Sequence, residues 1–210
     1  MSGETLLRAL KDQTRAGAPA LVLPVGEPLR AVLRPIATVP GALDAEDVRL
    51  LTEWRNRHVE RFLTEFVATN ARTAAWLSGT IHANGNKMLF MLESPEGTRL
   101  GHLGIGFIDW RGGYGEADAI VSGGASPPGL MKLALQTLLR WAREQLGLAH
   151  LAVRVRSDNP AVAFYRRVGF VEHRRTPLVA EDQPDGRTWR EAPEHVHSPV
   201  GLVHMRYQGG

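Results

Sequence analysis

The fold is decided by residues 157–170, which read SDNPAVAFYRRVGF. Asn159 is a good N-cap residue, and Pro160 suits the first position of a helix, where no amide hydrogen is needed. Gly169 predicts the end of that helix, because glycine readily adopts the left-handed conformation that closes one, and Phe170 is placed to pack back. The residues in between repeat at helical spacing and predict one buried face: Ala161, Phe164, Tyr165 and Val168.

This segment resembles the last conserved motif of the GNAT acyltransferases, in which an Asn, an Ala four residues on, Phe-Tyr and Gly-Phe recur. The resemblance implies that Asn159 and Phe164 contact the coenzyme and that Tyr165 protonates the leaving CoA thiolate. A phenol suits that step, since its reference pKa of about 10 is close to that of an alkyl thiol. Two plainer interpretations stay open: Tyr165 as a core tyrosine, and Asn159 as a helix cap alone.

Composition excludes several classes of protein. The 210 residues include no cysteine, which excludes disulfides, thiolate metal sites and a cysteine nucleophile. Hydrophobic residues make up 43% and charged residues 22%, as in ordinary globular proteins. No apolar run approaches the roughly 20 residues that span a bilayer. We therefore expect a cytoplasmic protein with no membrane partner.

The charge pattern gives little support to a nucleic-acid partner. The formal net charge is +3, but acidic and basic residues are interleaved along the chain. The high isoelectric point alone leaves a nucleic-acid-binding protein as an alternative, and we expect no such partner. A mild positive field would also suit an anionic cosubstrate such as acetyl-CoA.

Hydrophobic periodicity predicts alternating strands and helices along the rest of the chain. Strands are expected at 29–39, 87–93, 99–109, 116–122, 151–156, from 170 onward and at 201–207, and helices from 44, at 69–77, 129–147 and 160–168. Residues 181–199 are rich in Pro, Asp, Gly and His, which predicts a loop. The order predicts one α+β domain over 29–210, with a mixed, mostly antiparallel sheet flanked by helices, and matches the GNAT fold. Residues 1–28 are expected to form an N-terminal extension, which could pack on its own domain or on a partner in a homodimer.

The GNAT resemblance also implies where acetyl-CoA binds. In the family, the helix after the fourth strand holds the pyrophosphate at its N-terminus, where free amides and the positive helix end favour a phosphate. Here that helix starts near Gly129, which matches a family glycine, whereas Ser126 and Met131 depart from the family pattern. Backbone amides of the fourth strand bind the pantetheine arm and stabilise the oxyanion. The implied cofactor contacts are Ile120, Val121, Ser126, Gly129, Leu130 and Met131.

A general base must accept the proton of the attacking amine. Glu116 and Asp118 alternate onto one face of the expected fourth strand, where family members often place the base, so both are candidates. Either could instead be a solvated acid or a group that orients the acceptor. His102 and Asp109 are further alternatives. Three histidines near the C-terminus have uneven spacing, so we expect no metal site there: His195, His197 and His204.

Residues 50–57, with Trp76 and Leu77 after them, resemble the first helices of GNAT enzymes that acetylate amino sugars on nucleotides. The resemblance implies that Trp54, Arg55 and Arg57 face the acceptor, and arginines could bind a diphosphate. The plainer interpretation is an amphipathic helix with Trp54 in the core and both arginines in water. Trp110, after the third strand, could also border the acceptor site.

These observations predict an acetyl-CoA-dependent N-acetyltransferase that acts on a primary amine by direct attack in a ternary complex. The expected acceptor is a small molecule such as an amino sugar or sugar nucleotide. A protein N-acetyltransferase and a non-catalytic acyl-CoA-binding module with the same fold are the alternatives.

Overall fold

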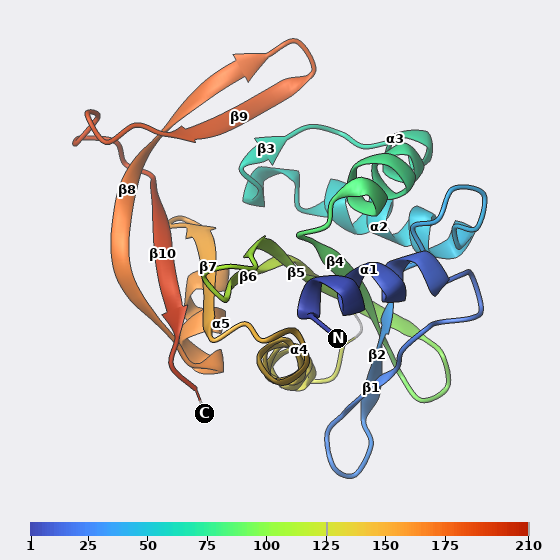
Figure 1. Cartoon of the computed structure of the whole chain (residues 1–210). Coiled ribbons are helices and arrows are strands. Elements are labelled where there is room, and N and C mark those ends of the chain that lie inside the picture. The colour runs from blue at the N-terminus through green and yellow to red at the C-terminus, as the bar shows by residue number, and fades with distance from the viewer. Residues whose placement is uncertain (125, 210) are drawn as a thin grey trace. The chain divides into compact units, whose positions relative to one another are not determined.

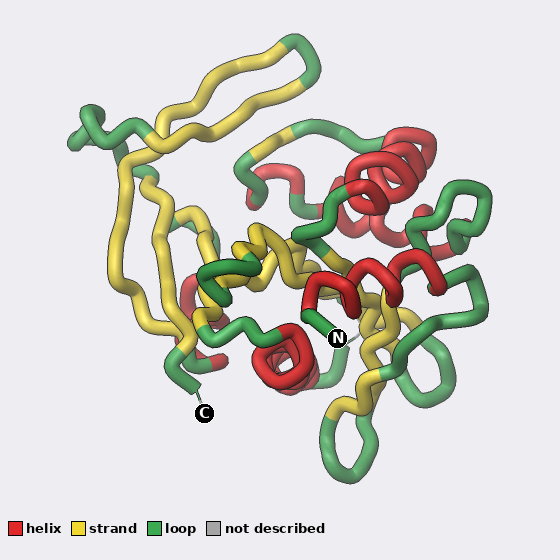
Figure 2. The backbone as a smooth tube through the Cα atoms, in the orientation of Figure 1, coloured by secondary structure: helices red, strands yellow, loops and turns green. Residues whose placement is uncertain are grey.

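The computed structural model describes every residue except Ala125 and Gly210. The chain folds into two compact units. Unit 1 contains Met1–Trp54 and Thr69–Leu151, and unit 2 contains Arg55–Ala68 and Ala152–Gly210. Each unit has its own antiparallel strands (Figures 1 and 2).

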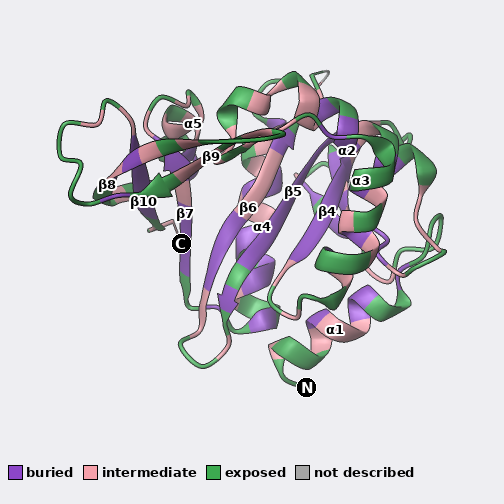
Figure 3. Cartoon of the chain, turned by 90° about the horizontal axis from the view of Figure 1, so that it is seen from above, coloured by how far each residue is buried: buried purple, intermediate pink, exposed green. Residues whose placement is uncertain are grey.

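Unit 1 is built on antiparallel strands in the order β1-β2-β4-β5-β6. Their bounds are β1 Leu23–Val25, β2 Ala31–Pro35, β4 Met88–Glu93, β5 Arg99–Asp109 and β6 Tyr114–Ser122. The central strands are buried on both faces (Figure 3), and five consecutive residues of β4 are inaccessible. This pattern matches the continuous apolar run in the sequence, because a strand covered on both sides has no polar face.

Helices cover both faces of these strands. The bounds are α1 Gly3–Gln13, α2 Ala45–Arg57, α3 Asn70–Ala75 continued by a π-helical turn at Trp76–Ile81, and α4 Leu130–Leu146. Helix α4 lies on one side of β4 and β5, and α2 and α3 lie on the other (Figure 1). Asp44 caps α2 as expected, since its carboxylate accepts from the amides of Glu46 and Asp47. Gly147 ends α4 in the left-handed conformation.

The predicted N-terminal extension contains regular structure. Helix α1 packs on α4, and β1 pairs with β2 in antiparallel register. The buried Lys11 donates to the carbonyls of Ile81, Asn84 and Lys87, and so satisfies carbonyls at the end of the helical segment that follows α3. The domain boundary at residue 28 stays a prediction.

Unit 2 contains strands in the order β7-β10-β8-β9-β3, with every described pair antiparallel. The elements are β7 His150–Arg156, β8 Phe170–Gln183, β9 Gly186–Glu191, β10 Gly201–Tyr207, the short β3 Thr64–Glu65, the 3₁₀ turn η1 Val59–Arg61 and helix α5 Ala161–Val168. Strands β8 and β10 pair along most of β10 (Figure 2).

The loop predicted over 181–199 is wrong in its first half. Strands β8 and β9 form a hairpin in which Gln183 pairs with Gly186, so that Pro184 and Asp185 make the turn. Pro, Asp and Gly favour both loops and tight turns, so composition alone did not separate the two. The α+β class and the strand at 201–207 are confirmed.

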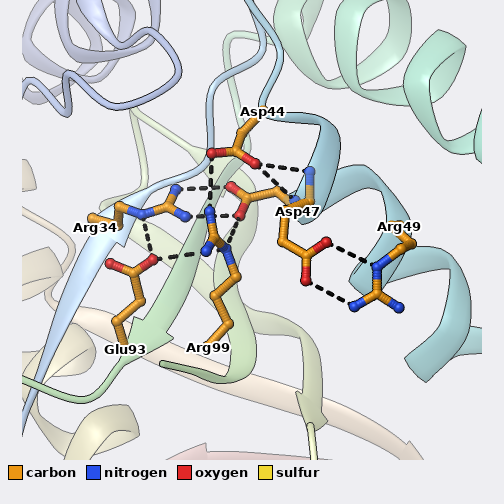
Figure 4. A network of polar contacts seen from close by, with 7 residues as sticks. Arg34, Asp44, Asp47, Arg49, Glu93 and Arg99 are labelled. Atoms are coloured by element: carbon orange, nitrogen blue, oxygen red, sulfur yellow. Dashed lines mark hydrogen bonds and ion pairs between the residues drawn. The ribbon is translucent and has the colours of Figure 1, made fainter. Parts of the chain in front are cut away.

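A buried ion network joins four elements of unit 1, α2, β2, β4 and β5 (Figure 4). Asp47 of α2 has a side chain that is only 1% exposed, and it accepts two hydrogen bonds from Arg34 of β2 at 2.8 and 2.7 Å. Arg99 of β5 donates to the same carboxylate at 2.8 Å and to Asp44 at 3.0 Å. Glu93 accepts from Arg34 at 2.8 Å. The paired charges let these groups leave water, so the network fixes α2 against the strands.

No helix of the described part of the chain is both long and apolar enough to cross a bilayer.

Candidate active site

The α5 motif forms the capped helix that the sequence predicts, one residue later than expected. The helix runs from Ala161, and Pro160 precedes it. The Asn159 side chain nevertheless accepts from the Ala161 amide at 2.9 Å, as a cap does. Gly169 closes the helix with φ of 120°, and its amide donates to the carbonyl of Tyr165. The amide nitrogen of Asn159's side chain donates to the Arg61 carbonyl at 3.1 Å.

Tyr165 is 8% exposed and lies among aromatic rings. Its ring centroid is 5.3 Å from that of Phe164 and 5.8 Å from that of Phe170, both in edge-on arrangements. Such contacts fix the direction of the phenol. Phe170 therefore packs back on the helix as predicted, and Phe164 remains half-buried.

Strand β6 contains a bulge at the place where the cofactor arm is predicted. His102 of β5 is opposite Val121, and Gly104 is opposite Asp118, so two β6 residues face one residue of β5. Ala119 and Ile120 together oppose Leu103, and Ala119 has φ of 49°, which is strained for a residue other than glycine. A bulge breaks the regular ladder and redirects the backbone groups of the strand.

Two side chains hold the Ala119 peptide groups. The Asp118 carboxylate accepts from the Ala119 amide at 2.7 Å. The His102 ring is hydrogen-bonded to the Ala119 backbone, and it stacks on Trp54 with centroids 6.0 Å apart. Burial lowers the pKa of His102 to about 4 against the opposing effect of that hydrogen bond, so the imidazole is neutral at pH 7.

The two predicted bases lie on one face of β6 in different surroundings. Glu116 is 6% exposed and accepts from the Tyr114 hydroxyl at 2.6 Å. Asp118 is ion-paired with Lys87. The residues opposite them on β5 are glycines, and a Cβ on Gly106 would lie 3.0 Å from the Asp118 carboxylate. Glycine at that position therefore makes room for the Asp118–Lys87 pair.

The start of α4 has the features that an anion site needs. Gly129 adopts a left-handed conformation with φ of 79°, and no atom lies within 4 Å of a Cβ placed there. The Ser126 hydroxyl donates to the Leu100 carbonyl at 3.3 Å and so ties the loop to β5. Leu130 is buried, whereas Met131 is half-buried with its methyl group against Gly101. The Leu130 amide donates to the Pro127 carbonyl at 3.1 Å, and the amides that follow it in the first turn have no partner within the helix, so an oxyanion can be bound there.

The residues predicted on the acceptor side lie in unlike surroundings. Trp54 is 2% exposed, as the core interpretation requires. The Arg55 guanidinium stacks on Phe62 and Phe66, at 4.6 and 3.9 Å from the ring centroids. Arg57 is exposed. Trp110 is half-buried and donates to the Asn86 side chain at 2.9 Å. Their part in acceptor binding stays a prediction.

Two charged residues near these sites were missed at the level of sequence. Lys87, which pairs with Asp118, precedes an apolar strand and gave no signal of its own. Arg156 ends β7 and is 6% exposed, although an arginine at a strand end is usually solvated. Its only sequence signal was the neighbouring Asp158, two residues on.

The C-terminal histidines do not come together. His195 is exposed, whereas His204 is 9% exposed and contacts Glu191 at 3.3 Å. Within the described residues, no three His, Asp or Glu side chains are placed to hold a metal ion.

Comparison with known proteins identifies what the fold resembles. The family model of the acetyltransferase (GNAT) domain matches residues 30–171. The chain is similar to the spermidine N-acetyltransferase of Vibrio cholerae solved with CoA and spermine, with 20% identity, a TM-score of 0.63, and coverage of 84% of this chain and 94% of that one. It is similar to a ribosomal L7/L12 alpha-N-protein acetyltransferase solved with coenzyme A, with 16% identity, a TM-score of 0.63, and coverage of 88% and 97%. No curated protein sequence matches significantly. The predicted fold is thereby confirmed.

Proposed function

Because this chain belongs to the GNAT acetyltransferase family, we propose that it transfers the acetyl group of acetyl-CoA to a primary amine by direct attack in a ternary complex. The observation that carries the proposal is the α5 motif, in which a capped helix presents a tyrosine fixed by two aromatic rings. The amine nitrogen bonds to the thioester carbon, the C–S bond breaks, and the thiolate takes a proton from Tyr165.

The cosubstrate has suitable partners in each unit considered by itself. In unit 1, the α4 N-terminus with Gly129 suits the pyrophosphate, and the bulged backbone at Ile120 and Val121 suits the pantetheine arm and the oxyanion. In unit 2, Asn159 suits a contact with the arm, together with its cap. The side-chain oxygen caps the helix and the side-chain nitrogen donates one hydrogen to the Arg61 carbonyl, so a ligand would be bound by the second hydrogen of that nitrogen.

We assign the general base to Glu116 rather than Asp118. Asp118 already holds the Ala119 amide and pairs with Lys87, which suits a residue that supports the bulge. Glu116 lies on the same face and, through the Tyr114 hydroxyl, has a route for a proton. Glu116→Gln should therefore lower kcat, whereas Asp118→Asn should mainly raise the KM for acetyl-CoA.

The acceptor is proposed to be a small amine. The structural relatives include an enzyme for spermidine and one for a protein N-terminus, and at this identity they support the reaction more than the substrate. An amino-sugar nucleotide needs arginines for its diphosphate, and Arg55 is stacked between two phenylalanines. We therefore place polyamines and other small amines first among the acceptors.

The test is a thiol-release assay with acetyl-CoA over spermidine, an amino-sugar nucleotide and a peptide with a free N-terminus. Tyr165→Phe should reduce kcat about 100-fold, as loss of a general acid does, and should leave the affinity for CoA nearly unchanged. Phe170→Leu is the matched control for packing, since that ring also contacts Tyr165 and has no predicted part in binding. Binding of CoA without thiol release from any acceptor would favour a non-catalytic binding module, and unfolding of Tyr165→Phe would favour the core interpretation of that residue.

A further inference from the structure

Arg156 is the most extensively bonded buried side chain of unit 2. The end of its guanidinium forms a two-point pair with Asp158, from Nε to Oδ1 at 3.0 Å and from one terminal nitrogen to Oδ2 at 2.7 Å. The other terminal nitrogen donates to Glu65 at 2.6 Å and to the Phe62 carbonyl at 3.3 Å. Its plane lies over the Trp189 ring, 4.2 Å from the centroid.

These partners belong to two parts of the chain that are far apart in sequence. Asp158 lies in the turn between β7 and α5, directly before Asn159. Phe62 and Glu65 lie in the segment Arg55–Ala68, which leads from the end of α2 toward α3 and contains only the short elements η1 and β3 besides the end of α2. A planar guanidinium has five donors in a fixed fork and so can hold both at once in one geometry, whereas a lysine has three donors on one freely rotating nitrogen.

Further bonds make the same connection around Arg156. The Asn159 side chain donates to the Arg61 carbonyl, and Arg61 donates to the Asp158 carbonyl at 3.5 Å. Trp189 donates from its indole to Glu65 at 2.6 Å, so the carboxylate is held from two sides. On its outer side, the segment borders a cavity of about 380 Å³ next to the β8–β9 turn. The turn that carries Asn159 thus supports this segment in addition to the pairing of β3 with β9.

We propose that Arg156 is a positioning residue that fixes the segment Arg55–Ala68 to the turn carrying Asn159. One buried guanidinium thereby aligns the predicted acceptor residues Arg55 and Arg57 with the predicted cofactor contact Asn159, all within unit 2. This inference rests on the proposed function, which places Asn159 at acetyl-CoA, and on the prediction from sequence that Arg55 and Arg57 face the acceptor. It also makes the two contacts interdependent: cosubstrate bound at Asn159 steadies the segment, and the acceptor then binds a segment that is already ordered.

The first experiment does not depend on activity. Trypsin cleaves after Arg57, which is exposed, and after Arg61, whose side chain is 44% exposed. Cleavage requires local opening of the segment, so Arg156→Met should speed cleavage at these bonds about tenfold, as followed by mass spectrometry. Arg156→Lys should give an intermediate rate, because it keeps the charge and loses the fork. Arg190→Met is the matched control, since that arginine of β9 is 60% exposed and pairs only at the surface with Glu181.

The second experiment measures kinetics on the same variants. Arg156→Met should raise the KM for the acceptor about tenfold while kcat changes by less than about threefold, because only the alignment is lost. Saturating CoA should slow tryptic cleavage of the wild type and have no such effect on Arg156→Met. If the methionine variant does not fold, Asp158→Asn provides the test, because that carboxylate is 42% exposed and its loss leaves Arg156 paired with Glu65.

Unchanged cleavage at Arg57 and Arg61 in a folded Arg156 variant would overturn the proposal. Equal losses in kcat and in both affinities would do so as well, since they would indicate a purely structural residue. If the wild type releases no thiol with any acceptor, the proposed function fails, and the cleavage rates still decide whether Arg156 locks the segment.

Discussion

Two buried arginine networks perform different tasks in this molecule. In unit 1, Arg34 and Arg99 converge on Asp47 and fasten a helix to the strands (Figure 4). In unit 2, Arg156 joins a turn to a segment with little regular structure of its own. The first network connects elements that hydrophobic packing already holds, whereas the second supports a segment whose only strand is the two-residue β3, paired with β9.

The difference shows that the same ion-pair chemistry has consequences that depend on what it connects. Burial disfavours the charge of Arg34, and its hydrogen bonds to Asp47 and Glu93 still raise its pKa. Burial acts in the same direction on Arg156, and bonds to Asp158 and Glu65 raise its pKa too. We expect loss of the first network to reduce global stability and loss of the second to reduce local order. The four predictions below test this contrast.

The largest effect is expected for Asp47→Ala. The change leaves Arg34 and Arg99 buried without their shared carboxylate, which should lower the free energy of unfolding by about 3–5 kcal/mol. Urea denaturation measures this loss. A loss below about 1 kcal/mol would mean that the network is not what fixes α2.

The next effect concerns His102, a buried ionisable group with no ion pair. The pKa of His102 is lowered from 6.5 to about 4, so the unfolded chain binds more protons between these values. The contribution of His102 to the free energy of unfolding is then fully present above pH 6.5. It falls by about 3 kcal/mol as the pH drops toward 4. His102→Gln should remove that part of the slope. Asp118 and Lys87 also face the imidazole, so the measurement is the difference between the two pH–stability curves.

A smaller effect on stability is expected for Asp158→Asn. The carboxylate is 42% exposed, and Arg156 keeps Glu65, so the loss should be about 1 kcal/mol or less. Local order should change more: hydrogen exchange of amides in Arg55–Ala68 should speed up while those of β8 and β10 stay protected. Equal acceleration in all of these elements would remove the contrast between the two networks.

The smallest effect is expected for Arg49→Ala. Arg49 is part of the cluster in Figure 4, but its side chain is 50% exposed and pairs with Glu46 and Glu53 along the helix surface. Water and salt screen such pairs, so the denaturation midpoint should stay within experimental error. A clear loss would show that the network extends to the surface.

Local signals account for what the sequence predicted well. Asn159 and Gly169 bound α5 because capping depends on a few neighbouring residues, and the strand predicted at 99–109 agrees with β5. Tertiary features escaped prediction: Ala119 looks like any strand residue, and its positive φ arises from contacts with His102 and Asp118. Strand β9 was missed because its turn has the composition of a loop.

The bulge in β6 also determines how this strand tolerates change in length. Because two residues oppose one, side chains after Ile120 are out of phase with those before Ala119. Deletion of one residue here would restore the regular ladder with Val121 still opposite His102, and would remove the positive φ that turns the Ala119 peptide groups out of that ladder. Homologues should therefore vary in length at the turn of the β8–β9 hairpin and keep a constant spacing between Asp118 and Val121.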